Sequence, residues 1–353
     1  MFNPKYKLTT NIVKMLVAIA EAKTIIEQAK ILPKQELRLR RQAMVRMTHS
    51  STAIEGNRLE IPEVEAVLAR KKISAPDRDI FEVQNYLNVL RYIEKIVQEK
   101  RQITEKVLLK IHRMVTCKTL PGESSGRYRP KPVFVVRRRW GSPDEIVYTG
   151  PDARKVPVLC ASLIKWTQNS EREGINPVIT AGIVHQEIAA IHPFNDGNGR
   201  TARALATLVL YSRGYDFRHL FALEDYYNRD RQKYYQAINI GKNYNERQHD
   251  FTSWLEYFTR GFREEIDNVR EKVNALSSKK IKRDISSKIY LDKDQLQILD
   301  FMDQVGRITA KDTADILECP KRTAQLQLQK LKRLGIIKQV GRGPASAYIA
   351  KSI

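Results

Sequence analysis

Residues 192–203 read His192-Pro-Phe-Asn-Asp-Gly-Asn-Gly-Arg-Thr-Ala-Arg203, and they follow one apolar segment, 177–190, and open a second, 199–213. Both segments have the three- and four-residue spacing of apolar positions that predicts helix, so the stretch is predicted to be a loop that opens a helix. Gly197 and Gly199 would let backbone N–H groups converge on an anion, and the helix dipole would add positive charge there. The sequence therefore predicts a phosphate site at this helix N-terminus.

The side chains of the same stretch suit chemistry on a phosphate. Arg200 and Arg203 are three residues apart, hence on one helix face. Asp196 is the one carboxylate, and Mg²⁺ in proteins is commonly held by one or two carboxylates plus phosphate oxygens. His192 has a side chain that can take a proton from an attacking hydroxyl near neutral pH. A lone histidine or a Gly-x-Gly loop is common in purely structural roles, but the combination indicates a reaction centre.

The rest of the chain is predicted to be mainly α-helical. Helical spacing also covers residues 8–31, 34–54, 62–71, 78–99, 104–116, 156–169 and 250–276. One β-hairpin is predicted from residues 131–137 and 145–148, and it would form a small flap on the helical body. The arginines at its tip could bind a partner or could discourage edge pairing, and the second interpretation is preferred.

A second domain is predicted after the polar, basic linker 277–288. Helices at 293–303, 310–317 and 321–334 precede strands at 336–340 and 347–350, which is the order of a winged helix-turn-helix. Residues 321–353 hold eight basic and no acidic residues. Groups able to meet DNA are Lys321, Arg322, Thr323, Gln325 and Arg342. The leucines at 326, 328, 331 and 334 are predicted to face the core. The alternative is a module that only docks protein or forms a homodimer.

Residues 192–203 match the motif His-Pro-Phe-x-(Asp/Glu)-Gly-Asn-Gly-Arg-x-x-Arg at every fixed position, and they resemble the Fic family. The resemblance covers about residues 51–240 and implies a helical fold with a β-hairpin flap. It also implies transfer of AMP from ATP to a Ser, Thr or Tyr hydroxyl of a protein, including this protein itself. His192 would be the base, and Asp196 would hold Mg²⁺. The candidate ATP-binding residues are Gly197, Asn198, Gly199, Arg200, Thr201, Ala202, Arg203, Tyr234 and Tyr235.

The segment Ser51-Thr-Ala-Ile-Glu55-Gly56 resembles the inhibitory motif (Ser/Thr)-x-x-x-Glu-(Gly/Asn) of that family. The resemblance implies that Glu55 competes with the ATP γ-phosphate for Arg203. The alternative is an ordinary helix end at Gly56. The predicted domains are then an N-terminal helical region with this helix (1–100), the Fic catalytic domain (101–276), the linker (277–288) and the winged helix (289–353).

Two other functions remain open at this point. The same site could remove AMP from a modified protein, with Glu55 positioning a water and His192 supplying the proton. The chain could also be a DNA-binding regulator whose Fic-like fold is inert, although a complete motif argues against it.

The 353 residues include 62 Lys and Arg against 40 Asp and Glu, a net charge of +22 that suits anionic partners. No segment is long and apolar enough to predict a membrane span, and the N-terminus does not read as a signal peptide. Three dispersed cysteines predict neither a zinc site nor a disulfide framework, which favours a cytoplasmic protein.

Overall fold

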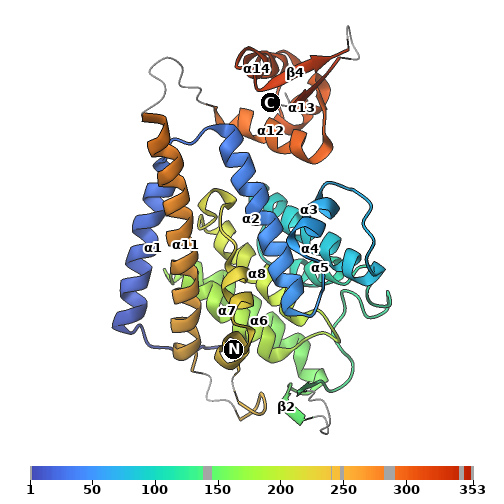
Figure 1. The fold of residues 1–353 in the computed structure, drawn as a ribbon. Coiled ribbons are helices and arrows are strands. Elements are labelled where there is room, and N and C mark those ends of the chain that lie inside the picture. Colours follow the sequence, from blue (N-terminus) through green and yellow to red (C-terminus); the bar gives the residue numbers. More distant parts are fainter. Residues whose placement is uncertain are drawn as a thin grey trace. The chain divides into compact units, whose positions relative to one another are not determined.

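The computed structural model describes residues 2–137, 145–239, 241–246, 250–281, 291–341 and 346–350 (Figure 1). The predicted fold class is confirmed, because the chain is mainly helical with two small sheets. It divides into two compact units. The first comprises Met1–Ala29 and Arg40–Val273, and the second comprises Lys30–Leu39 and Asn274–Ile353.

The elements up to residue 281 are α1 (Thr10–Gln28), α2 (Pro33–Ile54), α3 (Ile61–Leu68), α4 (Asp77–Gln98), α5 (Glu105–Val115), β1 (Phe134–Arg137), β2 (Glu145–Thr149), the 3-10 turn η1 (Ala153–Lys155), α6 (Val156–Arg172), α7 (Pro177–Ile191), α8 (Asn198–Ser212), the 3-10 turn η2 (Phe217–His219), α9 (Leu223–Arg229), α10 (Arg231–Ile238) and α11 (Thr252–Ile281). The sequence predicted no helix over α9 and α10. It also ended the last helix of this region at Leu276, whereas α11 continues through Lys-rich sequence that extends a helix at little cost.

Helices α7 and α8 form the centre of the first unit. Nearly all of their side chains are buried, which explains why α7 shows no polar face in its sequence. α7 begins with Asn176, whose side chain caps the amide of Val178, followed by Pro177 in the first turn. Gly182 of α7 lets α11 approach closely, because a Cβ there would lie 2.8 Å from Leu255 Cδ2. Figure 1 shows α4 and α5 beside this pair.

The predicted hairpin is present as β1 and β2, which pair antiparallel with an irregularity between Val135 and Val136. Residues 138–144, which include the predicted turn 140–144 and the arginines at 138 and 139, lie outside the described residues. Tyr148 of β2 is buried, and its hydroxyl donates to the carbonyl oxygen of Ala190 at 2.7 Å. The hairpin is thereby fixed to the end of α7.

The second unit contains α12 (Lys293–Val305), β3 (Ile308–Thr309), α13 (Ala310–Leu317), α14 (Lys321–Arg333), β4 (Ile337–Val340) and β5 (Ala347–Ala350). The sheet order is β3-β5-β4, and the two-residue strand β3 was not predicted. Its core includes Ile298, Ile308, Leu328 and Leu331. Leu326 was wrongly assigned to the core, since it is 52% exposed.

Of the helices in the described part of the chain, none is long and apolar enough to span a lipid bilayer. All three cysteines are free, as the sequence predicted.

Candidate active site

His192 follows the last residue of α7 and has a left-handed backbone, with φ 48° and ψ 59°. This conformation is uncommon for a residue with a side chain and persists only where neighbouring contacts hold it. Arg129 supplies one, because its Nε donates to the His192 carbonyl oxygen at 2.8 Å. Nδ1 of His192 lies 3.2 Å from the carbonyl oxygen of Ala189, which assigns the ring proton to Nδ1. Burial lowers the pKa of His192, so its Nε2 is a proton acceptor at pH 7.

The loop between His192 and α8 is closed by its own side chains. Asn198 donates from Nδ2 to the Phe194 carbonyl oxygen at 2.8 Å and accepts from the Phe194 amide at 2.9 Å. Gly197 has φ +76°, and a Cβ there would lie 2.8 Å from Thr116 Cγ2. Only glycine fits this conformation and this space. Asn198, predicted as an ATP-binding residue, therefore uses its side chain to shape the loop.

His112 of α5 is a site residue that the sequence did not reveal. Its ring stacks on Phe194 with centroids 3.6 Å apart, and its Nδ1 accepts from the Gly126 amide at 2.9 Å. Nε2 then carries the proton and donates to the Asp196 carbonyl oxygen at 3.0 Å. Burial lowers the pKa of His112 to about 4, which keeps this donor and acceptor pattern at neutral pH. His112 thus ties the Gly126 turn to the phosphate loop.

The first turn of α8 provides the predicted anion site. The amides of Asn198, Gly199 and Arg200 have no carbonyl acceptor within the helix, because they precede its first complete turn. The amide of Thr201 is already used, since it donates to Gly197 O at 3.0 Å. Thr201 and Ala202 are fully buried in α8, and neither offers a free backbone donor. Their prediction as ATP contacts is not supported by this geometry.

Arg203 is a buried cation with three groups of the α2 end as partners. Its Nε donates to Ser51 Oγ at 2.9 Å, and its Nη2 donates to Ser51 O and to Glu55 Oε1, both at 2.8 Å. Burial is the largest single effect and lowers the pKa of Arg203, but the Glu55 carboxylate together with Tyr234 and Tyr86 outweighs it, and the net shift is upward. The guanidinium therefore stays charged while only 2% of the residue is exposed.

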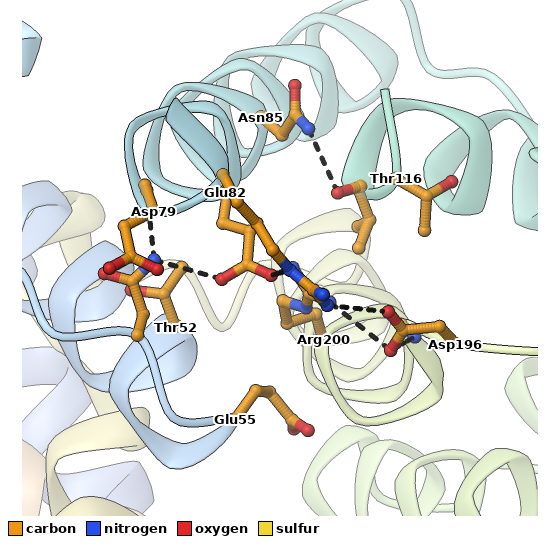
Figure 2. Close-up of polar contacts among 12 residues, drawn as sticks. Thr52, Glu55, Asp79, Glu82, Asn85, Thr116, Asp196 and Arg200 are labelled. Atoms are coloured by element: carbon orange, nitrogen blue, oxygen red, sulfur yellow. Dashed lines mark hydrogen bonds and ion pairs between the residues drawn. The ribbon is translucent and has the colours of Figure 1, made fainter. Parts of the chain in front are cut away.

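Glu55 also lies against the first turn of α8. A Cβ on Gly199 would be 2.2 Å from Glu55 Oε1 and 3.1 Å from Arg203 Nη1. The carboxylate thus lies where the helix amides and Arg203 would receive an anion. Figure 2 shows Glu55 reaching toward α8 from the turn after α2.

The turn that carries Glu55 is held from both sides. Gly56 has φ +94°, which ends α2 in the way that glycine favours. Tyr235 donates from its hydroxyl to Ile54 O at 2.9 Å, and Asn57 donates from Nδ2 to Glu82 Oε2 at 3.0 Å. Glu55 therefore belongs to a fixed turn.

The Arg200 side chain contacts Glu82 and Asp196, whereas that of Arg203 contacts Ser51 and Glu55. Its Nη1 lies 3.2 Å from Glu82 Oε1 of α4, and its Nη2 lies 3.6 Å from Asp196 Oδ1 (Figure 2). Its side chain is 2% exposed. The expectation that both arginines grip successive phosphates is thus not met by the side chains as they stand, although the Arg200 amide is part of the anion site.

Asp196 is the carboxylate predicted to hold Mg²⁺. Its side chain is 38% exposed, and Oδ1 accepts from the Gly197 amide at 2.6 Å. Among the described residues, no group of three or more His, Cys, Asp or Glu side chains could hold a metal ion alone. A magnesium ion bound mainly by phosphate oxygens needs no such group, so one accessible carboxylate beside an anion site fits it.

The two tyrosines of α10 differ. Tyr234 is 2% exposed, stacks on Tyr227 with centroids 4.6 Å apart and hydrogen-bonds His185. Its ring is packed into the core and its hydroxyl accepts from Arg203 Nη1 at 3.5 Å, so its place beside the adenine stays a prediction. Tyr235 is 48% exposed, so part of its ring is open to a ligand while its hydroxyl holds the α2 end.

In the second unit, Lys321, Arg322, Thr323 and Gln325 are all exposed on the first turns of α14. Arg342, the predicted contact from the wing, lies outside the described residues. Apart from Leu326, the exposed face of this helix is therefore polar and basic.

The geometry of α7, the loop and α8 agrees with a known family. The model of the Fic/DOC family matches residues 102–210, which include His192, Asp196 and both motif arginines. The chain contains a Fic domain. Glu55 and Tyr235 lie outside the matched residues of this Fic domain.

Comparisons with individual proteins extend the likeness. "Protein adenylyltransferase Fic" of Nematostella vectensis is 30% identical over 203 residues, which are 56% of this chain and 43% of that protein. The chain spans less than half the length of the curated Fic relatives that it matches. A crystal structure of a Fic family protein from Desulfovibrio desulfuricans G20 has a TM-score of 0.63 and 24% identity, covering 100% of this chain and 99% of that one. A Fic domain-containing signaling protein from Bacteroides thetaiotaomicron has a TM-score of 0.61 and 20% identity, covering 76% and 98%. These two structures show that the fold is shared.

Proposed function

We propose that this chain is a protein adenylyltransferase that moves AMP from ATP to a Ser, Thr or Tyr hydroxyl of a protein, including itself. The names of the curated relatives support the activity. The observation that carries the proposal for this chain is a neutral, half-buried imidazole, His192, in the loop that leads into the anion site at the first turn of α8.

In the proposed reaction, Nε2 of His192 takes the proton of the target hydroxyl. The hydroxyl oxygen then forms a bond to the α-phosphorus of ATP, the bond from that phosphorus to the bridging oxygen breaks, and pyrophosphate leaves. The amides of residues 198–200 and the Arg203 guanidinium hold phosphate oxygens and stabilise the developing charge. Asp196 would hold Mg²⁺, which neutralises phosphate charge when it is bound.

The experiment compares ATP labelled on the α-phosphate with ATP labelled on the γ-phosphate, using protein in which Glu55 is replaced by glycine. Label retained on protein from the α-position alone supports AMP transfer. Label retained from the γ-position would indicate a kinase and overturn the proposal.

Glu55 is proposed to inhibit this reaction. Its carboxylate binds Arg203 at 2.8 Å and lies against Gly199, so it takes both the cation and the space that a γ-phosphate needs. ATP would then bind only in a pose that misdirects its α-phosphate from His192.

Removal of AMP is a second candidate for the same site. The negative charge of Glu55 is close enough to raise the pKa of His192 against the larger lowering effect of burial. A carboxylate beside the histidine could position a water for hydrolysis. Incubation of AMP-modified protein with the wild-type enzyme distinguishes the two, because only hydrolysis releases free AMP in the absence of pyrophosphate.

We further propose that the second unit is a winged helix that binds DNA through α14. Its support is the exposed basic start of α14 and the absence of acidic residues from position 321 onward in the sequence. Salt-dependent binding to duplex DNA tests it. If DNA binding is found without AMP transfer, the inert-fold regulator is the correct alternative.

A further inference from the structure

Glu82 of α4 lies at the junction between the inhibitory turn and the phosphate loop. It is 5% exposed and belongs to neither sequence motif. Its Oε2 accepts from Asn57 Nδ2 at 3.0 Å, two residues after Glu55. Its Oε1 lies 3.2 Å from Arg200 Nη1 and accepts from Arg78 Nε at 3.2 Å.

These contacts close a ring of alternating charges. Arg78 reaches on to Asp196 Oδ2 at 3.3 Å, and Arg200 Nη2 lies 3.6 Å from Asp196 Oδ1. Two carboxylates, Glu82 and Asp196, therefore share two guanidiniums. Figure 2 shows Glu82 between Asp79 and Arg200, with Asp196 beyond Arg200.

The buried side of this ring depends on Glu82. Arg200 is 1% exposed, and neither its Nε nor its Nη1 has a hydrogen-bond acceptor among the described residues. A buried guanidinium without a carboxylate is strongly unfavourable. If Glu82 lost its charge, Arg200 and Arg78 would both turn to Asp196, the remaining carboxylate of the ring.

We propose that Glu82 is a positioning residue that keeps Asp196 available for Mg²⁺ and, through Asn57, holds the turn that presents Glu55. This inference rests on the proposed function of the site. Glu82 touches neither the expected nucleotide nor the metal, and it acts through Arg200, Arg78 and Asn57.

Glu82→Gln tests the proposal because the glutamine amide has one oxygen and cannot accept hydrogen bonds from the arginines and from Asn57 in the way that a carboxylate does. With its oxygen toward the arginines, its NH₂ group faces Asn57 Nδ2, which is also a donor, and Asn57 Oδ1 is already engaged by the Leu59 amide at 3.1 Å. The matched control is Asp79→Asn. Asp79 is on the same helix and contacts Arg58 Nε at 3.1 Å, so it loses the same charge outside the ring.

The effect of Glu82 on Mg²⁺ binding, here called the metal link, is measured in protein that also carries Glu55→Gly, so that inhibition is absent. Calorimetry follows ATP binding at increasing Mg²⁺. With Glu82→Gln, the Mg²⁺ needed for half-maximal ATP binding is expected to rise about tenfold or more, as for other groups that orient a metal ligand. With Asp79→Asn it should match the parent. Equal Mg²⁺ requirements for both variants would overturn the metal link.

The turn link is measured by hydrogen exchange with Glu55 in place. The Leu59 amide should exchange faster in Glu82→Gln than in wild type or Asp79→Asn. The Asn57 side chain that binds this amide then keeps only its bond to the Asp79 carbonyl oxygen at 3.0 Å, which both variants retain. Asn57→Ala should raise AMP transfer, because it loosens the turn that presents Glu55, and should leave the Mg²⁺ requirement unchanged. This variant tests the turn link even if Glu82→Gln fails to fold. Unchanged exchange at Leu59, or unchanged transfer by Asn57→Ala, contradicts the turn link. Loss of transfer by Glu55→Gly alone would instead refute the proposed function.

Discussion

Replacing Glu55 with glycine should raise AMP incorporation by about 10- to 100-fold. The Glu55 carboxylate accepts a charge-assisted hydrogen bond from Arg203 Nη2 at 2.8 Å. Such a bond to a charged group is worth about 1.5–3 kcal/mol, and each ~1.4 kcal/mol is a tenfold change in an equilibrium. In wild type, ATP must displace this bond before its γ-phosphate can reach Arg203.

Electrostatic repulsion adds to this cost. A γ-phosphate that approached the occupied site would face the carboxylate, and two unit charges about 4 Å apart repel by roughly 4 kcal/mol at an effective dielectric near 20. The Glu55 side chain is 29% exposed, so solvent screens part of this repulsion. We therefore take the hydrogen-bond value as the working magnitude.

The assay measures incorporation of α-labelled ATP by wild type, Glu55→Gly and Glu55→Gln under identical conditions. Glu55→Gln keeps the side-chain size and an acceptor for Arg203 but removes the charge, so its rate should be intermediate. Thermal unfolding confirms that each variant is folded. Equal or lower incorporation by a folded Glu55→Gly protein would refute the inhibitory role and leave residues 51–56 as an ordinary helix end.

The remaining predictions concern His192, Arg203, His112 of α5 and the second unit. His192→Ala should lower the transfer rate about 10²–10⁴-fold in stopped-time labelling while calorimetry still detects ATP binding. Burial lowers the pKa of His192, so its imidazole stays neutral below pH 6.5. The transfer rate should therefore fall only at more acidic pH, and a half-maximal rate at pH 6.5 or above would contradict this. Arg203→Ala should weaken ATP binding by roughly 1.5–3 kcal/mol in the Glu55→Gly background, measured by calorimetry, and unchanged affinity would remove Arg203 from the phosphate site. The pKa of His112 is lowered to about 4, so the unfolded chain binds a proton there first and stability should fall as pH drops from about 6.5 to about 4, by on the order of 2–3 kcal/mol. Burial also lowers the pKa of His185 and of His192, so urea unfolding should show a steeper loss of stability in wild type than in His112→Gln, and equal slopes would contradict the prediction. Deleting the residues after position 287 should abolish DNA binding and leave AMP transfer in place, whereas full DNA affinity without the tail would locate the interface elsewhere.

The local geometry of the motif was predictable because it depends on neighbours in sequence. Glycine at 197 in the left-handed region, the start of α8 at Asn198 and the burial of the following helix all follow from residues a few positions apart. The predicted helix end at Gly56 and the contact from Glu55 to Arg203 are also present.

Most contacts that organise the site join distant positions and could not be predicted. The one between Glu55 and Arg203 was expected only because the segment around Glu55 resembles the inhibitory motif of a known family. Glu82 and Arg200, or His112 and Asp196, meet only after the helices pack, and nothing in their own sequence neighbourhoods marks them. Tyr234 shows that neighbours in sequence can also be too alike to tell apart. It and Tyr235 are adjacent aromatics on a short helix that the sequence did not reveal, so only the fold decides which ring is buried.

The most direct test of the proposed activity is the intact mass of Glu55→Gly protein after incubation with ATP and Mg²⁺. Because the proposed function includes modification of the protein itself, no other target is added. The account predicts a mass increase of one adenylyl group, absent from Glu55→Gly/His192→Ala and from samples without ATP. A mass increase of one phosphate, or an unchanged mass with ATP shown to bind, would contradict it.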